Sequence, residues 1–399
     1  MAGLSRSNLA AAVVAFFVIW SLVAITITRE RVNTRANQCA ARLNFLSLAT
    51  VQHDFTRNYL PGYVQDFGTY SGDGSDRTDP ANHGVPRHKK LGTWAVALLP
   101  WLDAQPTYEH WTQDRYPVTT ISAALGKLDE SSGTGLHPLA APNLAIFQCP
   151  SNPVTRGNFG KNSMVYNNGL AWSPNQPPVG MSPNINDGVG SSKYNVTKLN
   201  PATGEGTHSS EGPNIGLDDF TDGKNCTILF SENIQALPWH RAGLIHSADL
   251  IMEAPHQKDV KFNLNMPQAF AAQYTQGMVW HYEDAEAANL KLSLRWNKLG
   301  TTAPVTPKNV APVHRINGCL NGDKNSLFNL RIDDAHTAAD YARPSSAHNT
   351  GVNVVFADGS TRFINETIDY RIYQELMTPC GKKSSIPFRQ TVLPAEFRK

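Results

Sequence analysis

LAAAVVAFFVIWSLVAITI, residues 9–27, contains no charged side chain in 19 consecutive positions. At a rise of 1.5 Å per residue, a helix of this length spans about 28 Å, close to the thickness of the hydrocarbon core of a bilayer. A secretory signal peptide has a shorter apolar core followed by a small-residue cleavage site, and no such site follows this run. We therefore expect a retained single-pass transmembrane helix, preceded by a short leader-like segment at 1–8, rather than a buried core helix.

The helical pattern continues beyond the apolar run. Seven residues, most of them apolar or small, recur at alternating steps of four and three, which places them on one stripe of a helix. These residues are Val32, Ala36, Cys39, Leu43, Leu46, Thr50 and His53. The pattern predicts one helix from about residue 8 to 56, in which residues 28–56 form a stalk that packs on the domain at 57–399.

The charges at the two ends of the helix do not decide its orientation. Arg6 precedes the apolar run, whereas Arg29, Arg31 and Arg35 follow it. Taken alone, the positive-inside rule favours a cytoplasmic C-terminal side, but long trailing domains translocate largely regardless of charge. The orientation is left open by this count.

Composition limits the partners of the 399-residue chain. The formal net charge is +2 and the charged fraction is 17%, so we expect no nucleic-acid partner. Five cysteines are scattered without a Cys-x-x-Cys pair, which argues against a zinc knuckle or a thioredoxin-type site. Outside the cytoplasm one or two disulfides can form, and spacing alone does not assign the partners.

The rest of the chain predicts a β-rich body with long loops. We expect a loop at 57–91 and a surface insertion at 173–216, because both are rich in Gly, Pro, Asn, Asp or Ser. Residues 94–111 predict two short helices separated by a proline, and residues 369–377 predict another helix. Short strands are expected at 145–150, 163–168 and 226–231.

VNVVFADGSTRFI (352–364) predicts a β-hairpin. Asp358-Gly359 is a preferred two-residue type I′ turn, because both positions need positive φ. Closing this turn pairs Val354 with Phe363 and predicts one buried face. That face consists of Val352, Val354, Phe356 and Phe363.

The hairpin belongs to a longer stretch, SSAHNTGVNVVFADGSTRFINETIDYRIYQELMTP, in which nine residues separate His348 from Asp358-Gly359. This stretch, within 348–379, resembles the C-terminal signature of a large bacterial family of prepilin-like proteins of unknown function. RANQCAARLNFLSLATVQHDF, WAVALLPWLDAQPTYEHW, FQCPSNP and DDFTDGKNCTILFSEN fit the same family in order. Its members look like pseudopilins of type II secretion systems. The resemblance implies an α+β fold, with a long N-terminal helix on an antiparallel sheet, and an extracytoplasmic body anchored in the bacterial cytoplasmic membrane.

One stretch departs from the pilin pattern. Pilin-type precursors carry a Gly-Phe-Thr-Leu-x-Glu style processing site before the apolar run, whereas this chain has GLSRSNLAAAVV, with no glutamate until Glu30. Processing and glutamate-dependent filament assembly are therefore not expected by the usual route. A permanently anchored monomer is an alternative to a filament subunit.

We consider first whether His348 and Asp358 form a catalytic or metal-binding pair. An extended strand at 351–357 is about 23 Å long and separates them, far beyond hydrogen-bond distance. We therefore expect structural roles: turn chemistry for Asp358, positive φ for Gly359, and a cap or a contact with another segment for His348. No catalytic residue and no metal ligand is predicted.

Two loops could hold calcium, although no cofactor is the favoured expectation. Asn321, Asp323 and Asn325 alternate as at the start of an EF-hand, but Ser326 and Ile332 replace its glycine and glutamate. The other loop contains Asp73, Asp76 and Asp79.

We find no metalloprotease, nucleophile-elbow or phosphate-loop motif in the sequence. The favoured function is that of a pilin-like envelope protein with a structural or interaction role. Its partners would be the bilayer, through residues 9–27, and other pilin-like subunits or envelope polymers. The alternative is an anchored carbohydrate- or polymer-binding surface protein that uses the loops at 57–91 and 173–216.

Overall fold

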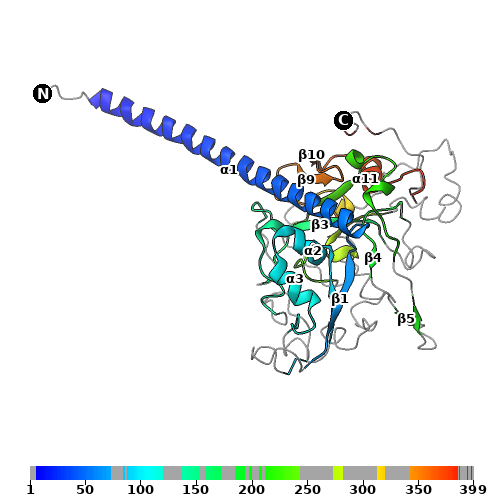
Figure 1. Cartoon of the computed structure of the whole chain (residues 1–399). Helices are drawn as coiled ribbons and strands as arrows, with labels where there is room; N and C mark the ends of the chain where they lie inside the picture. Colours follow the sequence, from blue (N-terminus) through cyan, green and yellow to red (C-terminus); the bar gives the residue numbers. More distant parts are fainter. Residues whose placement is uncertain are drawn as a thin grey trace.

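The structure is a computed structural model that describes most of the N-terminal helix and the packed body. The described residues are 6–72, 84–85, 88–119, 137–152, 159–171, 185–193, 197–199, 206–208, 212–242, 273–281, 312–319, 341–384, 386, 393 and 397. Figure 1 shows one long helix, α1, that projects from a body of sheets, short helices and loops.

Helix α1 runs without interruption from Arg6 to Arg57, in agreement with the single helix predicted at about 8–56. Its N-terminal half extends away from the body (Figure 1), and the side chains from Val13 to Leu22 that the structure describes are exposed. By length and composition this helix can cross a membrane, and none of its most apolar window is buried in the body.

The C-terminal half of α1 packs on the body through the predicted stripe. Cys39, Leu43 and Leu46 are fully buried, and His53 is 3% exposed. Val32, which belongs to the same predicted stripe, is 55% exposed because the body reaches the helix only further along. The buried contact therefore begins near Cys39 rather than at Val32.

A five-stranded sheet forms the centre of the body, in the order β10-β9-β7-β3-β8. Its strands are β3 (Met164–Leu170), β7 (Ile228–Glu232), β8 (Gly277–Trp280), β9 (Gly351–Phe356) and β10 (Thr361–Asn365). Strand β8 pairs parallel with β3, while the other pairs are antiparallel. The expected purely antiparallel sheet is therefore wrong, since the long connection before β8 lets that strand enter beside β3 in the parallel direction.

The residues expected to form a loop at 57–91 contain two strands. β1 (Val64–Tyr70) pairs antiparallel with β2 (His88–Gly92) and parallel with β4 (Ser192–Lys193). These strands were not predicted because polar residues dominate the region. Val64, Tyr70 and Leu91 are among their buried residues. Inside the expected insertion at 173–216, β5 (Thr197–Leu199) pairs with β6 (Gly206–His208).

The body also contains short helices. The predicted pair at 94–111 is present as α2 (Trp94–Leu98), the 3₁₀ helix η2 (Leu99–Leu102) and α3 (Gln105–Thr112). The strand expected at 145–150 is instead the 3₁₀ turn η3 (Ala145–Phe147), which carries Phe147 into the core. Other helices are η4 (Leu217–Asp219), η5 (Lys224–Cys226), η7 (Pro312–His314) and α11 (Tyr370–Met377).

The hairpin of β9 and β10 has a different register from the predicted one. The turn contains three residues, Ala357, Asp358 and Gly359, and the Phe356 amide donates to the Ser360 carbonyl at 2.9 Å. A type I turn followed by a left-handed residue is the usual three-residue hairpin loop, and Gly359 has φ +84°. The one-residue shift aligns Val352 with Ile364, which is 3% exposed, and leaves Phe363 49% exposed. The expected burial of Phe363 is therefore wrong, because a one-residue slip moves a strand's side chains to the opposite face.

Strand β9 is buried on both faces. Val355 and Ala357 belong to a core shared with α1 and α2. Val352, Val354 and Phe356 point to the other side, into a core that includes residues of α11. By strand alternation, the side chain of Asn353 lies on the same face as Val355, toward α1. This face carries the candidate site.

Candidate functional site

A disulfide ties helix α1 to the body. Cys39, on the buried stripe of α1, is bonded to Cys149, which follows η3 after one intervening residue. Both residues are buried, and 110 positions separate them in the sequence. The three other cysteines, Cys226, Cys319 and Cys380, are buried and lie outside this disulfide.

A buried histidine and a buried carboxylate lie against this disulfide. His348 Nε2 is 3.1 Å from Glu232 Oε1 and 3.6 Å from Cys149 Sγ. The side chains of His348 and Glu232 are only 4% and 2% exposed. Among the described residues, His348 is the recorded ion-pair partner of Glu232. Burial of a carboxylate is costly without such a partner, so the pair stabilises the position of both side chains.

Backbone and amide groups fix the orientation of the pair. Asn353 donates from its backbone nitrogen to Glu232 Oε2 at 3.3 Å and from Nδ2 to Oε1 at 3.2 Å. The backbone amide of His348 donates to Ser346 Oγ at 3.0 Å, and that hydroxyl donates to the Gly351 carbonyl at 2.7 Å. The site is therefore assembled from α1, the segment after η3, the end of β7, and the loop that leads into β9.

This arrangement does not resemble a nucleophilic triad. His348 meets both Glu232 and Cys149 through the same ring atom, Nε2, whereas a triad uses one imidazole nitrogen for the nucleophile and the other for the carboxylate. The four residues are also between 0% and 8% exposed, which leaves a substrate no direct access. Donor atoms of Cys39, Cys149, Glu232 and His348 do all lie within 4.8 Å of one another, the spacing of a compact ligand set.

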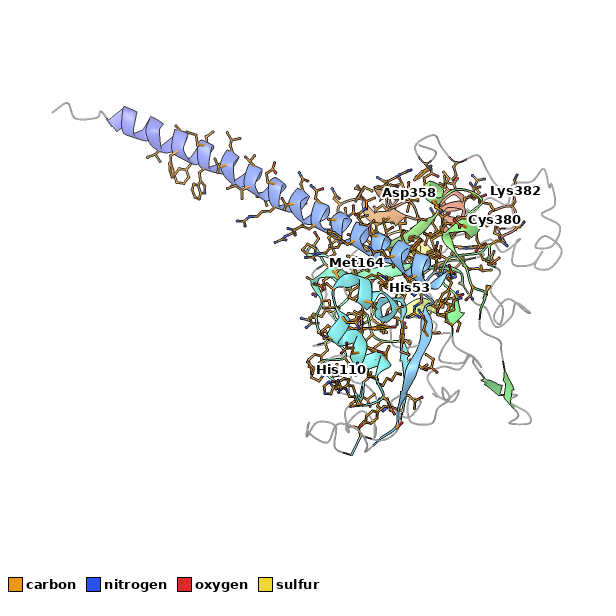
Figure 2. All side chains as sticks on the ribbon, viewed as in Figure 1. His53, His110, Met164, Asp358, Cys380 and Lys382 are labelled. Atoms are coloured by element: carbon orange, nitrogen blue, oxygen red, sulfur yellow. A yellow bond between two sulfur atoms is a disulfide. The ribbon has the colours of Figure 1, made fainter. Side chains whose placement is uncertain are left out.

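The structure places the motif residues His348 and Asp358 beyond opposite ends of β9, with separate partners. His348 contacts Glu232, while Asp358 Oδ1 accepts hydrogen bonds from the backbone nitrogen and the hydroxyl of Ser360, at 2.9 and 2.7 Å. Gly359 supplies the left-handed turn residue. Figure 2 shows Asp358 at the tip of the hairpin, beside α1.

Sequence reasoning missed Glu232, Asn353 and the partners of the disulfide. One usable signal was the carboxylate at the end of the otherwise apolar run ILFSE, since a charged side chain in a buried strand requires a partner. The two calcium candidates, at 73–79 and 321–325, lie outside the described residues.

A second buried titratable group has a structural explanation. Lys90 Nζ donates to the backbone carbonyls of His110 and Gln113 at 2.8 and 2.6 Å, at the C-terminal end of α3. Burial lowers the pKa of this ammonium to about 8, while nearby Asp114 partly offsets the effect. A cation that caps the last carbonyls of a helix opposes the negative end of the helix dipole.

These features define an α+β protein whose exposed apolar N-terminal helix is long enough to span a membrane and is bonded to the body by a buried disulfide. The chain belongs to the family described as "protein of unknown function (DUF1559)", which matches residues 29–371. The match begins two positions after the end of the apolar run and includes all four residues of the buried cluster. No curated protein and no solved structure matches the chain.

Proposed function

We propose that this chain is a pilin-like protein of the bacterial cell envelope, held in the cytoplasmic membrane by residues 9–27, with an extracytoplasmic body and a structural or interaction role without catalysis. The observation that carries this proposal is the continuity of α1, a single helix of 52 residues. The described side chains of its first half are exposed, and its second half packs on the body through Cys39, Leu43 and Leu46.

Exposure supports a lipid environment for the first half. Phe16, Phe17, Ile19 and Trp20 are each between 60% and 65% exposed. Soluble proteins rarely leave a contiguous apolar surface of this kind uncovered, because apolar area in water costs about 25 cal/mol per Å². A bilayer covers this surface without any change in the body.

The disulfide supports the outward orientation. Structural disulfides persist in oxidising compartments and are rare in the cytosol of ordinary bacteria. Cys39 lies in the stalk and Cys149 in the body, both outside the apolar run, so the stalk and the body belong on the oxidising side. The disulfide therefore favours an extracytoplasmic body, which the charges at the two ends of the helix leave undecided.

The stalk carries a surface suited to an interaction role. Along the side of α1 turned away from the body lies an uncharged outer face, formed by Asn37, Ala41, Phe45, Leu48, Val51, Gln52 and Phe55. Phe45, Leu48 and Phe55 are 57%, 48% and 87% exposed. We assign this face to contact with a second copy of the chain, since copies anchored through the same residues 9–27 hold their outer faces at equal heights above the bilayer.

The anchor and its orientation are tested on the full-length protein expressed in a bacterial host. We expect the protein to sediment with membranes, and protease added to intact spheroplasts to remove the body while leaving a fragment of about 30 residues. A freely soluble full-length protein would contradict the anchor. Digestion of the body only after lysis would contradict the outward orientation.

The contact face is tested by a photo-reactive phenylalanine analogue at position 55 in membranes. We expect a cross-linked dimer, and its loss when Phe45 and Leu48 are both changed to serine. The matched control is the same analogue at Phe363, an exposed aromatic residue on the hairpin, which should give no dimer. A cross-link from position 55 only to another protein, or equal dimer from both positions, would rule out the second copy as occupant.

A further inference from the structure

We propose that the buried cluster is a redox-gated site for a thiophilic divalent metal ion such as Zn²⁺. In this proposal Cys39, Cys149, Glu232 and His348 are the ligands once the disulfide is reduced. The inference goes beyond the envelope role proposed for the chain. On the oxidising side of the membrane, where that role places the body, the disulfide is the resting form, and a dithiol must reduce it before the ion binds.

The geometry fits a four-coordinate ion. One donor atom from each of the four residues lies within 4.8 Å of all the others. In a tetrahedral zinc site, with bonds of about 2.0–2.3 Å, neighbouring donors are roughly 3.3–3.8 Å apart. Small side-chain rotations therefore close the set around one ion, provided that the two sulfur atoms are free to separate. The disulfide prevents this separation, so the oxidised protein does not bind the ion.

The charges in the cluster favour a cation. Glu232 is buried, and its recorded ion-pair partner among the described residues is His348, which carries charge only when protonated. Reduction adds two thiols beside this carboxylate. A divalent ion compensates two of the three negative charges of the carboxylate and the two thiolates, whereas neutral thiols leave Glu232 dependent on His348 and Asn353.

An outer shell that orients the ligands is already present. Asn353 holds both carboxylate oxygens of Glu232, and Ser346 holds the backbone of His348. Such outer partners usually contribute 10- to 100-fold to metal affinity. Four protein ligands leave no open position for water or substrate, so the site has the character of a structural rather than a catalytic zinc centre.

The chemistry balances with a dithiol reductant. The reductant supplies two electrons and two protons, breaks the Cys39–Cys149 bond, and leaves as its own disulfide. Binding of the metal ion then releases the two thiol protons, because thiolate is the ligand. Exchange with the disulfide form of that dithiol removes two electrons from the two thiolates, restores the Cys39–Cys149 bond and expels the ion, and the carrier takes up two protons to leave as its dithiol.

The test uses full-length protein in detergent, reduced with a phosphine, freed of reductant without oxygen, and titrated with Co²⁺. We expect one equivalent of Co²⁺ to produce thiolate-to-metal charge-transfer and tetrahedral ligand-field absorption bands, which Zn²⁺ then displaces. The oxidised protein should show neither band. Glu232→Gln and His348→Asn should each weaken Co²⁺ binding about 10-fold or more.

The free cysteines provide the matched control. Cys319→Ser/Cys380→Ser should retain the full signal, and Cys39→Ser/Cys149→Ser should abolish it. The proposal is overturned if the reduced protein gives no charge-transfer band, or if the band survives in Cys39→Ser/Cys149→Ser. Near-UV circular dichroism covers the case in which reduction loosens the fold: recovery of the native signal on addition of Zn²⁺ supports the site, and failure to recover it refutes the site.

Discussion

The side-chain amide of Asn44 on helix α1 donates a 2.7 Å hydrogen bond to the carbonyl oxygen of Gly359 in the β9–β10 turn. One helical turn further on, Ser47 Oγ contacts the carbonyl of Phe356 at 3.4 Å. The hairpin tip is therefore docked on the stalk, and at the other end of β9 His348 lies against the disulfide that holds α1. The two ends of β9 are therefore both held against α1, one through the hairpin turn and the other through His348 and the disulfide.

The turn itself gives the first prediction. Gly359 has φ +84°, and a Cβ added there would meet no atom closer than 3.9 Å, so a substitution is strained without a clash. Gly359→Ala should therefore lower the free energy of unfolding by about 1 kcal/mol. Gly359→Asn should cost less, because asparagine tolerates the left-handed region. Denaturant unfolding of the protein in detergent measures both, and an Asn variant less stable than the Ala variant would contradict this explanation.

The register of the hairpin gives the second prediction. Ile364 is 3% exposed and Phe363 is 49% exposed. Ile364→Thr should cost about 2 kcal/mol or more, because it removes buried apolar volume and introduces a hydroxyl. Phe363→Thr should cost less than about 1 kcal/mol. If Phe363→Thr proved more destabilising than Ile364→Thr, the result would favour the register expected for a two-residue turn.

The disulfide gives the third prediction. Cys39 and Cys149 close a loop over a sequence separation of 110 residues. Cys39→Ser/Cys149→Ser should lower stability by about 3–5 kcal/mol, since the unfolded chain regains the entropy that the cross-link removes. The control is Cys319→Ser/Cys380→Ser, which alters two buried thiols and no cross-link. Equal losses of stability for the two double variants would show that packing, and not the cross-link, accounts for the effect.

The buried ion pair gives the fourth prediction. Removal of Glu232 leaves His348 and two donors of Asn353 without their partner in a buried site. Glu232→Ala should cost about 3 kcal/mol in unfolding free energy, and Glu232→Gln should cost less, because the amide oxygen still accepts from Asn353. Asp218→Ala, which removes an exposed ion pair with Lys224, is the control and should cause no measurable change.

The fifth prediction concerns acid sensitivity. Burial, followed by the charges of Arg57 and Lys193, lowers the pKa of His53 from 6.5 to about 4, although its hydrogen bond to the Tyr59 carbonyl opposes the shift. The unfolded chain therefore binds a proton more readily between about pH 6.5 and pH 4. The contribution of neutral His53 to the free energy of unfolding is therefore fully present above pH 6.5. It is lost as the pH falls toward 4, by an amount on the order of 3 kcal/mol.

His53→Gln tests this assignment, because glutamine keeps a donor for the Tyr59 carbonyl and does not titrate. The variant should be less sensitive to acid over the same window in thermal unfolding at a series of pH values. Burial also lowers the pKa of His240, so part of the acid sensitivity should remain. An unchanged pH profile would contradict the role given to His53.

Sequence reasoning identified the elements that have a local signature. The 3.6-residue period over the stalk predicted a helix whose buried stripe includes Cys39, Leu43 and Leu46, because residues three and four apart share one helix face. It likewise predicted the helix at α11, whose N-cap Asp369 accepts from the Arg371 amide at 2.9 Å. The strand expected at 145–150 failed because one apolar turn ending at Phe147 satisfies the same short pattern.

Sequence alone thus determined the extent of α1, the face it buries, and the presence of the hairpin, since each depends on residues close together in the chain. Only the tertiary structure decided the three-residue turn, the parallel direction of β8, the pairing of Cys39 with Cys149 and the contact of His348 with Glu232. These features join segments as many as 116 positions apart. No local period encodes them, because they form only when separate faces are buried together.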